Sequence, residues 1–223
     1  MRKVSKKVIS CFMLCALMMS IIMGFAINSN AADLDGSKSQ RDDGTYVYYV
    51  GTPSSLRKAV KGANDGDCIE FTRDIVYSGT LYVSKKIKID FNLNSLKFIN
   101  TLNGLYINVG KGKGITLKNG TIYGANDSNS AVYVNESKVN LKCMEIYGGD
   151  CKRTDYYWGN GIYVDYESSI YMNDCFVMGG NGYKSKNDGH YRTAGAAISY
   201  KYGVTSDGKG YAQKDGVCKP DEE

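Results

Sequence analysis

The chain has 223 residues, a formal net charge of +5 and 23% charged residues. Four of its 28 Lys and Arg residues lie within the first seven positions, and the rest of the chain is close to neutral, so the composition excludes a general affinity for nucleic acid. Two prolines, 26 glycines and 19 tyrosines indicate many short strands joined by tight turns.

The N-terminus has the pattern of a secretory signal peptide. The basic start is followed by an apolar run from 8 to 27, and Ser29-Asn30-Ala31 forms a small-x-small cleavage pattern. We therefore expect residues 1–31 to be removed and the protein to be secreted and extracellular, with no stable membrane insertion after cleavage. The alternative is an uncleaved anchor, because about 20 apolar residues can span a bilayer.

Residues 32–45 are polar and are expected to form a flexible lead-in. Residues 46–50 alternate as a short strand does. In the following segment, SSLRKAVKGANDGDCIEF, Ser54 or Ser55 is expected to cap a short helix, and the chain resumes as a strand at 68–71. The apolar residues of this helix fall on one face. They are Leu56, Ala59, Val60 and Ala63.

An apolar-Tyr-apolar triplet then recurs at 81–83, 105–107, 132–134 and 162–164. The steps are 24, 27 and 30 residues, which is the range of solenoid repeats. A second and a third apolar segment follow each triplet, and the last three repeats align without a gap as ITLKNGTIYG, VNLKCMEIYG and IYMNDCFVMG. Each repeat therefore predicts three short strands.

Within each strand the apolar residues are two apart and share one face. One repeat has too few of them to form a core, so we expect the repeats of a 46–203 domain to stack in parallel, with the apolar faces inward. The 204–223 tail has no apolar period and is expected to be polar and disordered. The C-terminal end of the stack would then be open, and oligomerisation through it is expected.

These segments resemble the right-handed parallel β-helix proteins of the pectin lyase-like superfamily, over roughly residues 46–200. The SLRKAVKGANDGDCIEF segment is similar to the helix and first strand that cover the N-terminal end of such proteins, and Asn119 stands at a bend where the family stacks asparagines. The resemblance implies an all-β fold: a right-handed single-stranded parallel β-helix with a short N-terminal capping helix, shorter here than in relatives.

The resemblance also implies that the protein acts on or binds polysaccharide, including acidic, pectin-like polymers, either as a polysaccharide lyase or as a glycoside hydrolase. The same superfamily contains adhesins and exported proteins without known activity. A non-catalytic surface protein and an inactive fragment of a larger β-helix protein therefore stay open as alternatives.

The outward tyrosines of the triplets are expected to stack along the first-strand face, where they either hold sugar rings or simply stabilise the sheet. Long loops return from the third strand to the next first strand, and they contain the single Trp and the single His. Aromatic and cationic side chains together suit an acidic polysaccharide. The expected substrate-binding residues are Trp158, Tyr156, Arg153, Tyr133 and Tyr163.

The catalytic candidates are weaker. His190, within NDGHYR, resembles the Gly-His element of galacturonan hydrolases, and Arg192, Asp165 and Asp174 complete the set. The paired aspartates of those enzymes are not found at the expected place. No cofactor is expected, with calcium as the alternative for a lyase, held by acidic residues of the return loops. Those residues are Asp150, Asp155 and Asp188.

Five cysteines follow residue 31, and an odd number leaves at least one unpaired or bonded to another molecule. No C-x-x-C pair is present, so a zinc site is not expected. Cys143 and Cys175 occupy adjacent columns of the aligned repeats and could form a disulfide, with packed thiols as the alternative.

Overall fold

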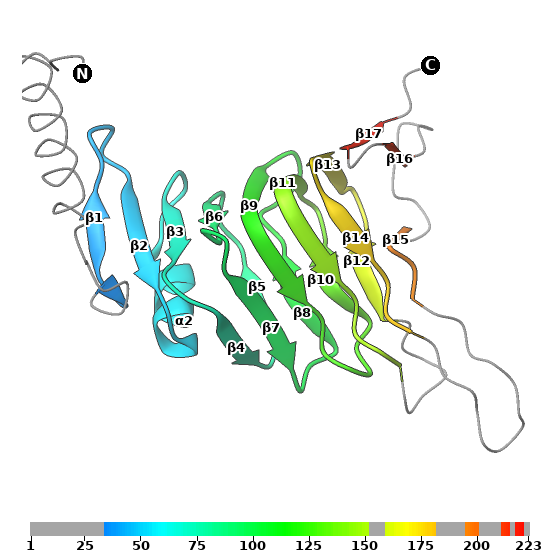
Figure 1. Cartoon of the computed structure of the whole chain (residues 1–223). Helices are drawn as coiled ribbons and strands as arrows, with labels where there is room; N and C mark the ends of the chain where they lie inside the picture. Colours follow the sequence, from blue (N-terminus) through cyan, green and yellow to red (C-terminus); the bar gives the residue numbers. More distant parts are fainter. Residues whose placement is uncertain (1–33, 152–158, 182–194, 201–210, 215–216, 221–223) are drawn as a thin grey trace, which may run out of the picture.

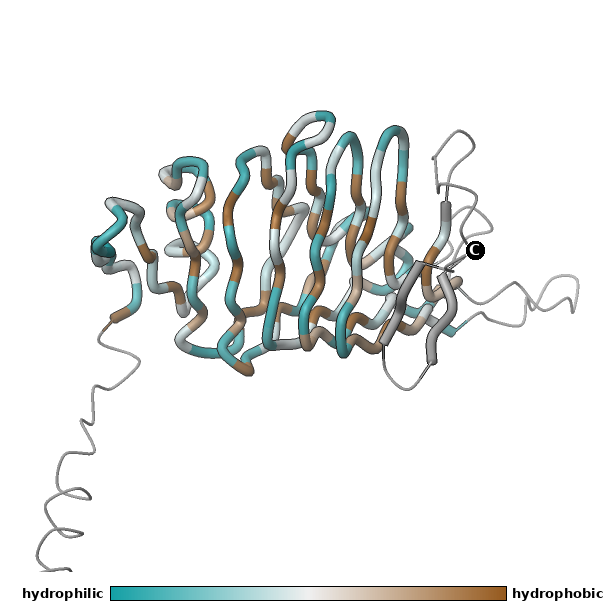
Figure 2. The backbone as a smooth tube through the Cα atoms, turned by 90° about the horizontal axis from the view of Figure 1, so that it is seen from above, coloured by the Kyte–Doolittle hydropathy of each residue, from teal (hydrophilic) through white to brown (hydrophobic). Residues whose placement is uncertain are grey.

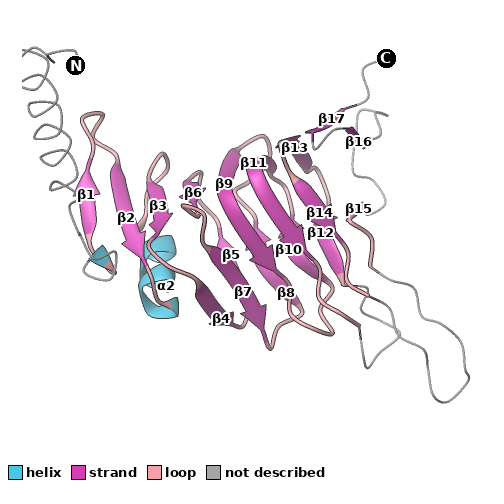
Figure 3. Cartoon of the chain, in the orientation of Figure 1, coloured by secondary structure: helices cyan, strands magenta, loops and turns pink. Residues whose placement is uncertain are grey.

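The structure is a computed structural model that describes residues 34–151, 159–181, 195–200, 211–214 and 217–220. Strands dominate these residues, with one helix among them, α2 at Pro53–Gly62 (Figures 1 and 3). The strands form a ten-stranded sheet, a five-stranded sheet and a two-stranded sheet. The expected all-β class is therefore correct.

The ten-stranded sheet has nine strands in parallel pairings and one antiparallel edge strand, β1. It contains β1 (Lys38–Gln40), β2 (Tyr46–Val50), β3 (Cys68–Phe71), β4 (Ile75–Ser78), β6 (Lys88–Asp90), β7 (Ser95–Ile99), β9 (Gly114–Tyr123), β11 (Lys138–Tyr147), β13 (Ser169–Asn173) and β14 (Phe176–Met178). The five-stranded sheet is parallel and contains β5 (Leu81–Val83), β8 (Asn103–Ile107), β10 (Ser130–Val134), β12 (Asn160–Val164) and β15 (Ile198–Tyr200).

The four triplets form adjacent strands of the five-stranded sheet in the register that their spacing predicts. Tyr82 lies opposite Tyr106, Tyr106 opposite Tyr133, and Tyr133 opposite Tyr163. The second and third segments of each repeat pair in the ten-stranded sheet, so each repeat contributes to both sheets. Seen from above, the tube passes from one sheet to the other and back in successive turns along one axis (Figure 2).

The bend between second and third segments is also where the alignment places it. Asn119, Cys143 and Asp174 occupy the same aligned position, and their φ angles are 59°, 51° and 52°. This left-handed conformation is favoured for Asn and Asp but costs free energy at Cys143. Gly120 follows the first of these bends. A Cβ there would overlap the side chain of Phe91, so the close approach of the two turns requires glycine.

The inward faces of both sheets meet in one hydrophobic cluster. Leu105 and Ile107, the neighbours of Tyr106 in its strand, are both 0% exposed, as are Ile122 and Ile146 of the third segments. Alternation in every strand thus places the apolar residues inside and leaves the tyrosines of the triplets outside. Phe98 of β7 is also fully buried.

Leu56 and Ala59 of helix α2, and Ala63 directly after it, are buried in this cluster. The N-cap of α2 is Thr52, and not Ser54 or Ser55 as expected from the sequence. Pro53 fits the first helical position because its φ is fixed and it lacks an N–H, and the cap is therefore the residue before it, Thr52. Thr52 and Ser55 form a capping box in which each side chain binds the other residue's backbone.

The 32–45 segment differs from the expected flexible lead-in, because it contains β1, which pairs antiparallel with β2. The backbone N–H of Gly36 donates to the carbonyl of Tyr49 at 2.8 Å, and the N–H of Gly51 donates to the carboxylate of Asp35 at 2.6 Å. Without β1, β2 would be an unpaired edge strand. The N–H and C=O groups at the edge of β2 bind the backbone of β1, which explains why this polar segment forms a strand.

Within the 204–223 tail the structure places two strands, β16 (Tyr211–Lys214) and β17 (Val217–Pro220), which pair antiparallel. Strand β17 contacts β13, a terminal strand of the ten-stranded sheet. Backbone pairing between two strands requires no alternation of apolar residues. The hydrophobic pattern of the sequence therefore does not predict these two strands. Disorder in the rest of the tail stays a prediction.

The proposed signal peptide, residues 1–31, lies outside the described residues. Over the ranges that the structure does describe, none of the helices has the length and apolar character needed to cross a bilayer.

Cys143 is exposed and carries a free thiol whereas Cys175 is buried, so the Cys143–Cys175 disulfide is not formed. The reason is that the adjacent columns of the alignment point to opposite sides of the sheet.

Candidate functional site

The four triplet tyrosines form one column on the outer face of the five-stranded sheet. The ring centroids of Tyr82 and Tyr106 are 5.3 Å apart, those of Tyr106 and Tyr133 4.9 Å, and those of Tyr133 and Tyr163 5.1 Å. The last two pairs are stacked with interplanar angles of 8° and 17°, whereas the first is tilted at 47°. The stacking predicted from the spacing is therefore confirmed for Tyr106, Tyr133 and Tyr163, whereas Tyr82 contacts Tyr106 at a tilt.

A continuous stack limits what these rings can bind. The two faces of Tyr106 and of Tyr133 are covered by neighbouring rings, so only ring edges and hydroxyl groups point outward. Tyr82 is different, because β5 is the last strand of its sheet and, among the described residues, no tyrosine covers the second face of its ring. Its side chain is 66% exposed. A sugar ring can therefore lie flat on Tyr82, whereas it can meet Tyr133 only at an edge.

Tyr133 has a further contact that its position in the stack does not require. Its hydroxyl donates a hydrogen bond to the carboxylate of Asp165, which also accepts the backbone N–H of Tyr166 at 2.8 Å. Asp165 is only 6% exposed. Burial, together with this hydrogen bond, raises the pKa of the Tyr133 phenol well above its ordinary value, so the phenol stays protonated and Asp165 stays its acceptor.

The second acidic candidate does not lie beside the first. Asp174 is at the bend between β13 and β14, where its carboxylate accepts the side-chain amide of Asn173 at 2.9 Å. Asp165 precedes β13, and that strand alone separates the two turns by roughly 13 Å at about 3.3 Å per residue. Paired glycosidase carboxylates are separated by about 5–9.5 Å. Asp165 and Asp174 thus do not form such a pair.

Several expected site residues lie outside the described residues. They are Arg153, Tyr156, Trp158, His190 and Arg192, together with the calcium candidates Asp155 and Asp188. The described calcium candidate, Asp150, accepts the backbone and side-chain N–H groups of Asn181 at 3.0 and 3.1 Å. Across the described ranges, no three His, Cys, Asp or Glu side chains are grouped as metal ligands would be.

A cleft of about 570 Å³ lies beside Tyr82, and we call it the Tyr82 cleft. Its walls are turns from three successive returns toward the five-stranded sheet. The lining residues are Gly79, Thr80, Tyr82, Asn100, Thr101, Leu102, Asn103, Asn126 and Asp127. Apart from Tyr82, a member of the predicted column, none of them was anticipated as a site residue. The sequence repeat does contain a signal for them: the short connections that lead back to the five-stranded sheet occupy the same position in each repeat as the long return loops do.

The polar groups of this cleft are fixed before any ligand arrives. The hydroxyls of Thr80 and Thr101 lie 2.6 Å apart, and both contact the backbone carbonyl of Asn103, at 2.8 and 2.7 Å. The side-chain oxygen of Asn103 accepts hydrogen bonds from Asn129 and Ser130. These bonds orient the Asn103 amide, whose N–H groups have no acceptor among the described residues.

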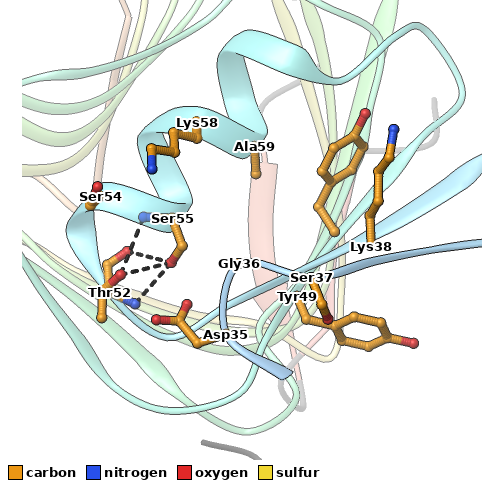
Figure 4. A pocket seen from close by; sticks show the side chains of 11 residues that line it. Asp35, Gly36, Ser37, Lys38, Tyr49, Thr52, Ser54, Ser55, Lys58 and Ala59 are labelled. Atoms are coloured by element: carbon orange, nitrogen blue, oxygen red, sulfur yellow. Dashed lines mark hydrogen bonds between the residues drawn. The ribbon is translucent and has the colours of Figure 1, made fainter. Parts of the chain in front are cut away.

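A second cleft, of about 420 Å³, lies between β1, β2 and the first turn of α2 (Figure 4). Asp35 lies below that turn, close to Thr52 and Ser55. Burial acts to raise the pKa of Asp35, but hydrogen bonds from Ser55, Gly51 and Thr52 outweigh it and hold the pKa below its usual value. The Asp35 carboxylate already connects the 34–45 segment to the N-terminus of α2. We therefore interpret this cleft as structural and not as a binding site.

Comparison of the chain with models of known protein families, with curated proteins and with solved structures gives no match. The resemblance to the pectin lyase-like superfamily therefore stays a prediction that rests on the residues alone. Function has to be argued from the site.

Proposed function

We propose that the parallel repeats form a right-handed β-helix, with α2 as its N-terminal cap. Two observations support this finer description of the fold. Each repeat pairs with the next in both sheets at the spacing of the sequence repeat, and the inward faces of the two sheets share one core. The capping role is supported by the burial of Leu56, Ala59 and Ala63 against that core.

We further propose that the protein is secreted and binds polysaccharide at the Tyr82 cleft, beside the first-strand face. The observation that carries this proposal is that one residue, Tyr82, both ends the ring stack and lines a polar cleft. An exposed aromatic face next to fixed amide and hydroxyl groups matches a sugar, which has C–H groups on its faces and hydroxyls around its rim.

The scaffold explains why the arrangement is suited to binding. Each wall of the cleft is a short turn held at both ends by parallel strands, so little conformational entropy is lost when a ligand orders it. The repeat also places equivalent turns one strand spacing apart, which is about 4.8 Å. An extended polymer lying along the axis would meet similar groups at regular intervals.

Binding without turnover is the function that the described residues favour. The two described acidic candidates, Asp165 and Asp174, are on different turns. The Asp165 carboxylate already accepts hydrogen bonds from the hydroxyl of Tyr133 and the N–H of Tyr166. A polysaccharide lyase or glycoside hydrolase is the second candidate, favoured by the His, Trp and Arg residues that the sequence places in the long return loops. Release of reducing ends or of unsaturated uronate from a polymer would establish the enzyme.

The test is retention on a panel of insoluble neutral and acidic glycans, with and without calcium, using wild-type protein and two single variants. Tyr82→Ala removes the exposed ring face and should abolish retention. Tyr171→Ala is the matched control, because Tyr171 is a comparably exposed tyrosine on β13. Equal retention of Tyr82→Ala and wild type would exclude the Tyr82 cleft as the site.

A further inference from the structure

The third segments of the repeats carry exposed apolar side chains on their outer face. These segments are β4, β7, the C-terminal halves of β9 and β11, and β14, and they pair side by side in that order (Figure 1). The register aligns one outward residue from each segment in a single row, which we call the third-strand row. Its members are Val76, Lys97, Tyr123, Tyr147 and Met178.

The row is exposed, although the neighbouring residues in the same strands are buried in the core. Val76, Tyr123 and Met178 are 53, 40 and 47% exposed, and Phe176, which is diagonal to Tyr147 across the strands, is 42% exposed. The rings of Tyr123 and Tyr147 are stacked with their centroids 5.2 Å apart, and Phe176 contacts Tyr147 at 5.7 Å. A contiguous exposed apolar patch of this kind marks an interaction surface.

The chemistry of the row favours a protein surface over a sugar. Tyr123 and Tyr147 each use one ring face in their mutual stacking. The aliphatic side chains of Val76 and Met178 at the two ends of the row offer no ring on which a sugar could lie. The side chains of a second β-sheet, in contrast, interdigitate with such a face when the two sheets are about 10 Å apart.

Two opposite charges on this face are placed for contact between two copies. Lys97 lies on β7 and Glu145 on β11, with β9 between them. Two strand spacings are about 10 Å, so these side chains do not pair within one chain. The Glu145 carboxylate accepts the hydroxyl of Tyr147 at 3.1 Å, which keeps it beside the row. A positive and a negative group on either side of a middle strand are complementary to a second copy turned about that strand.

We propose that the protein forms a twofold-symmetric homodimer through the third-strand row, with the two sheets face to face. The middle of the five third segments is β9, so we place the twofold axis parallel to β9 and over Tyr123. This axis sets β7 of one copy against β11 of the other, and β4 against β14. Tyr123 then meets Tyr123 of the second copy at the centre of the interface.

The remaining contacts of this dimer are between complementary groups. Val76 meets Met178 of the second copy, so apolar side chains are buried together. Lys97 meets the ring of Tyr147 of the second copy and lies within reach of Glu145 beside that ring. A cation is stabilised by an aromatic face and by a carboxylate. Each of these contacts occurs twice, as an isologous interface requires.

The size of the face sets the expected strength of the dimer. Five strands at a spacing of about 4.8 Å span only about 24 Å. A standard interface buries about 800 Å² on each partner, so we expect this smaller one to give a dissociation constant in the micromolar range. Tyr82 lies in the other sheet, and the dimer is therefore independent of the function proposed for the Tyr82 cleft.

The experiment is sedimentation velocity of the secreted protein from about 5 to about 500 µM, which should show a concentration-dependent shift from monomer to dimer. Tyr123→Ser should weaken the dimer at least about tenfold, because it removes the central side chain from both copies. Tyr171→Ser is the matched control and should leave association unchanged. Tyr171 is a comparably exposed tyrosine, but it lies on β13, outside the row.

Charge reversal tests how the two copies are oriented. Lys97→Glu and Glu145→Lys should each weaken the dimer severalfold, because each variant places like charges opposite each other at two positions. Both changes in one chain should restore association. An equal mixture of the two single variants should also associate, because opposite charges then face each other again. Failure of both combinations to restore the dimer would overturn the proposed axis.

A protein that stays monomeric up to about 500 µM would overturn the proposal. A dimer that Tyr123→Ser does not weaken would also overturn it, and would place the contact elsewhere, such as the C-terminal end of the stack. In a monomeric protein, loss of glycan retention by Tyr123→Ser would assign the row to polysaccharide instead. Urea midpoints close to wild type establish that the variants are folded.

Discussion

The hydroxyl of Tyr133 donates to the carboxylate of Asp165, a residue of the turn that follows the next strand of the same sheet. This contact joins two repeats through their outer face, whereas most of the stack is joined through backbone pairing and the core. It also explains how a carboxylate can remain buried at the outer face of the sheet, since its oxygens have donors from Tyr133 and from the N–H of Tyr166.

We expect Tyr133→Phe to destabilise the protein by about 1–3 kcal/mol, because it leaves the buried Asp165 without its phenol donor. The ring stack itself is preserved in this variant. Tyr106→Phe is the control, since Tyr106 occupies the same column, and it should cost less than Tyr133→Phe. Urea unfolding measures both. Equal destabilisation of the two variants would mean that the Asp165 contact contributes nothing specific.

The bends provide a second prediction. Gly120→Ala introduces a Cβ that overlaps Phe91 and should cost more than about 2 kcal/mol by overpacking. Gly62→Ala places the same methyl group at the end of α2, where a Cβ meets nothing within 4 Å. There Ala should be neutral or stabilising by up to about 1 kcal/mol, through helix propensity. Thermal midpoints that shift equally in both variants would contradict this account of Gly120.

Much of the stack was predictable because the repeat spacing and the two-residue alternation act on every strand at once. The register of Tyr82 and Tyr163 and the bend at Asn119 all follow from an alignment of the chain with itself. The β1 strand was not predictable in this way. Its three residues are polar and exposed, and its order comes from the unpaired edge of β2, which only the assembled sheet creates.

The candidate site was predicted less well than the fold. The sequence identifies the tyrosine column but not which ring has an open face, because that depends on β5 being the last strand of its sheet. It likewise does not bring Thr80, Thr101 and Asn126 together, since they belong to turns separated by more than 20 residues with no shared motif. Their proximity is a consequence of stacking, and only the three-dimensional register shows it.

Thiol reactivity gives a third prediction. Cys143 is exposed at a positive-φ bend, whereas Cys68 is buried and burial raises the pKa of its thiol. In a Cys218→Ser background, a maleimide should therefore modify Cys143 rapidly in the folded protein and Cys68 only after unfolding. Peptide mass spectrometry identifies the sites. Loss of the fast reaction in Cys143→Ser confirms the assignment, and fast modification of Cys68 would contradict it.

The return loops give a fourth prediction, which concerns the binding residues expected from the sequence. Replacing Trp158 and Arg192 together with Ala should abolish retention on glycan if the long loops form one wall of a binding groove beside the first-strand face. The thermal midpoint should stay within a few degrees of wild type, as is usual for substitutions outside a core. Retention that survives this double change but not Tyr82→Ala would confine the site to the Tyr82 cleft.

The last prediction concerns two carboxylates that lie side by side on β3 and β6. Glu70 and Asp90 are directly opposite each other in the register. Burial acts to raise the pKa of Asp90, but hydrogen bonds from Lys118, the N–H of Asn92 and the amide of Asn119 hold it below its usual value. Burial first, and the Asp90 charge second, raise the pKa of Glu70 above its usual value.

The two shifts affect stability in opposite directions. The folded-state pKa of Asp90 lies below its unfolded value of about 3.9, so its contribution is present above that pH and is lost as the pH falls through the folded pKa. The folded-state pKa of Glu70 lies above its unfolded value of about 4.3, so its contribution is complete below that pH and is lost as the pH rises through the folded pKa. At pH 7 Asp90 stabilises the fold and the Glu70 charge opposes it.

We therefore expect Glu70→Gln to stabilise the protein at pH 7 by up to about 1 kcal/mol, and to have little effect at pH 4, where the carboxyl group of wild type is largely protonated. Asp90→Asn should destabilise by about 1–3 kcal/mol at pH 7, because it removes the acceptor of the Lys118 ion pair, whose N–O distance is 2.6 Å. That cost should shrink as the pH falls. Urea midpoints of both variants at the two pH values measure these differences. A destabilising Glu70→Gln at pH 7 would contradict this account, because it would mean that the Glu70 charge is favourably paired.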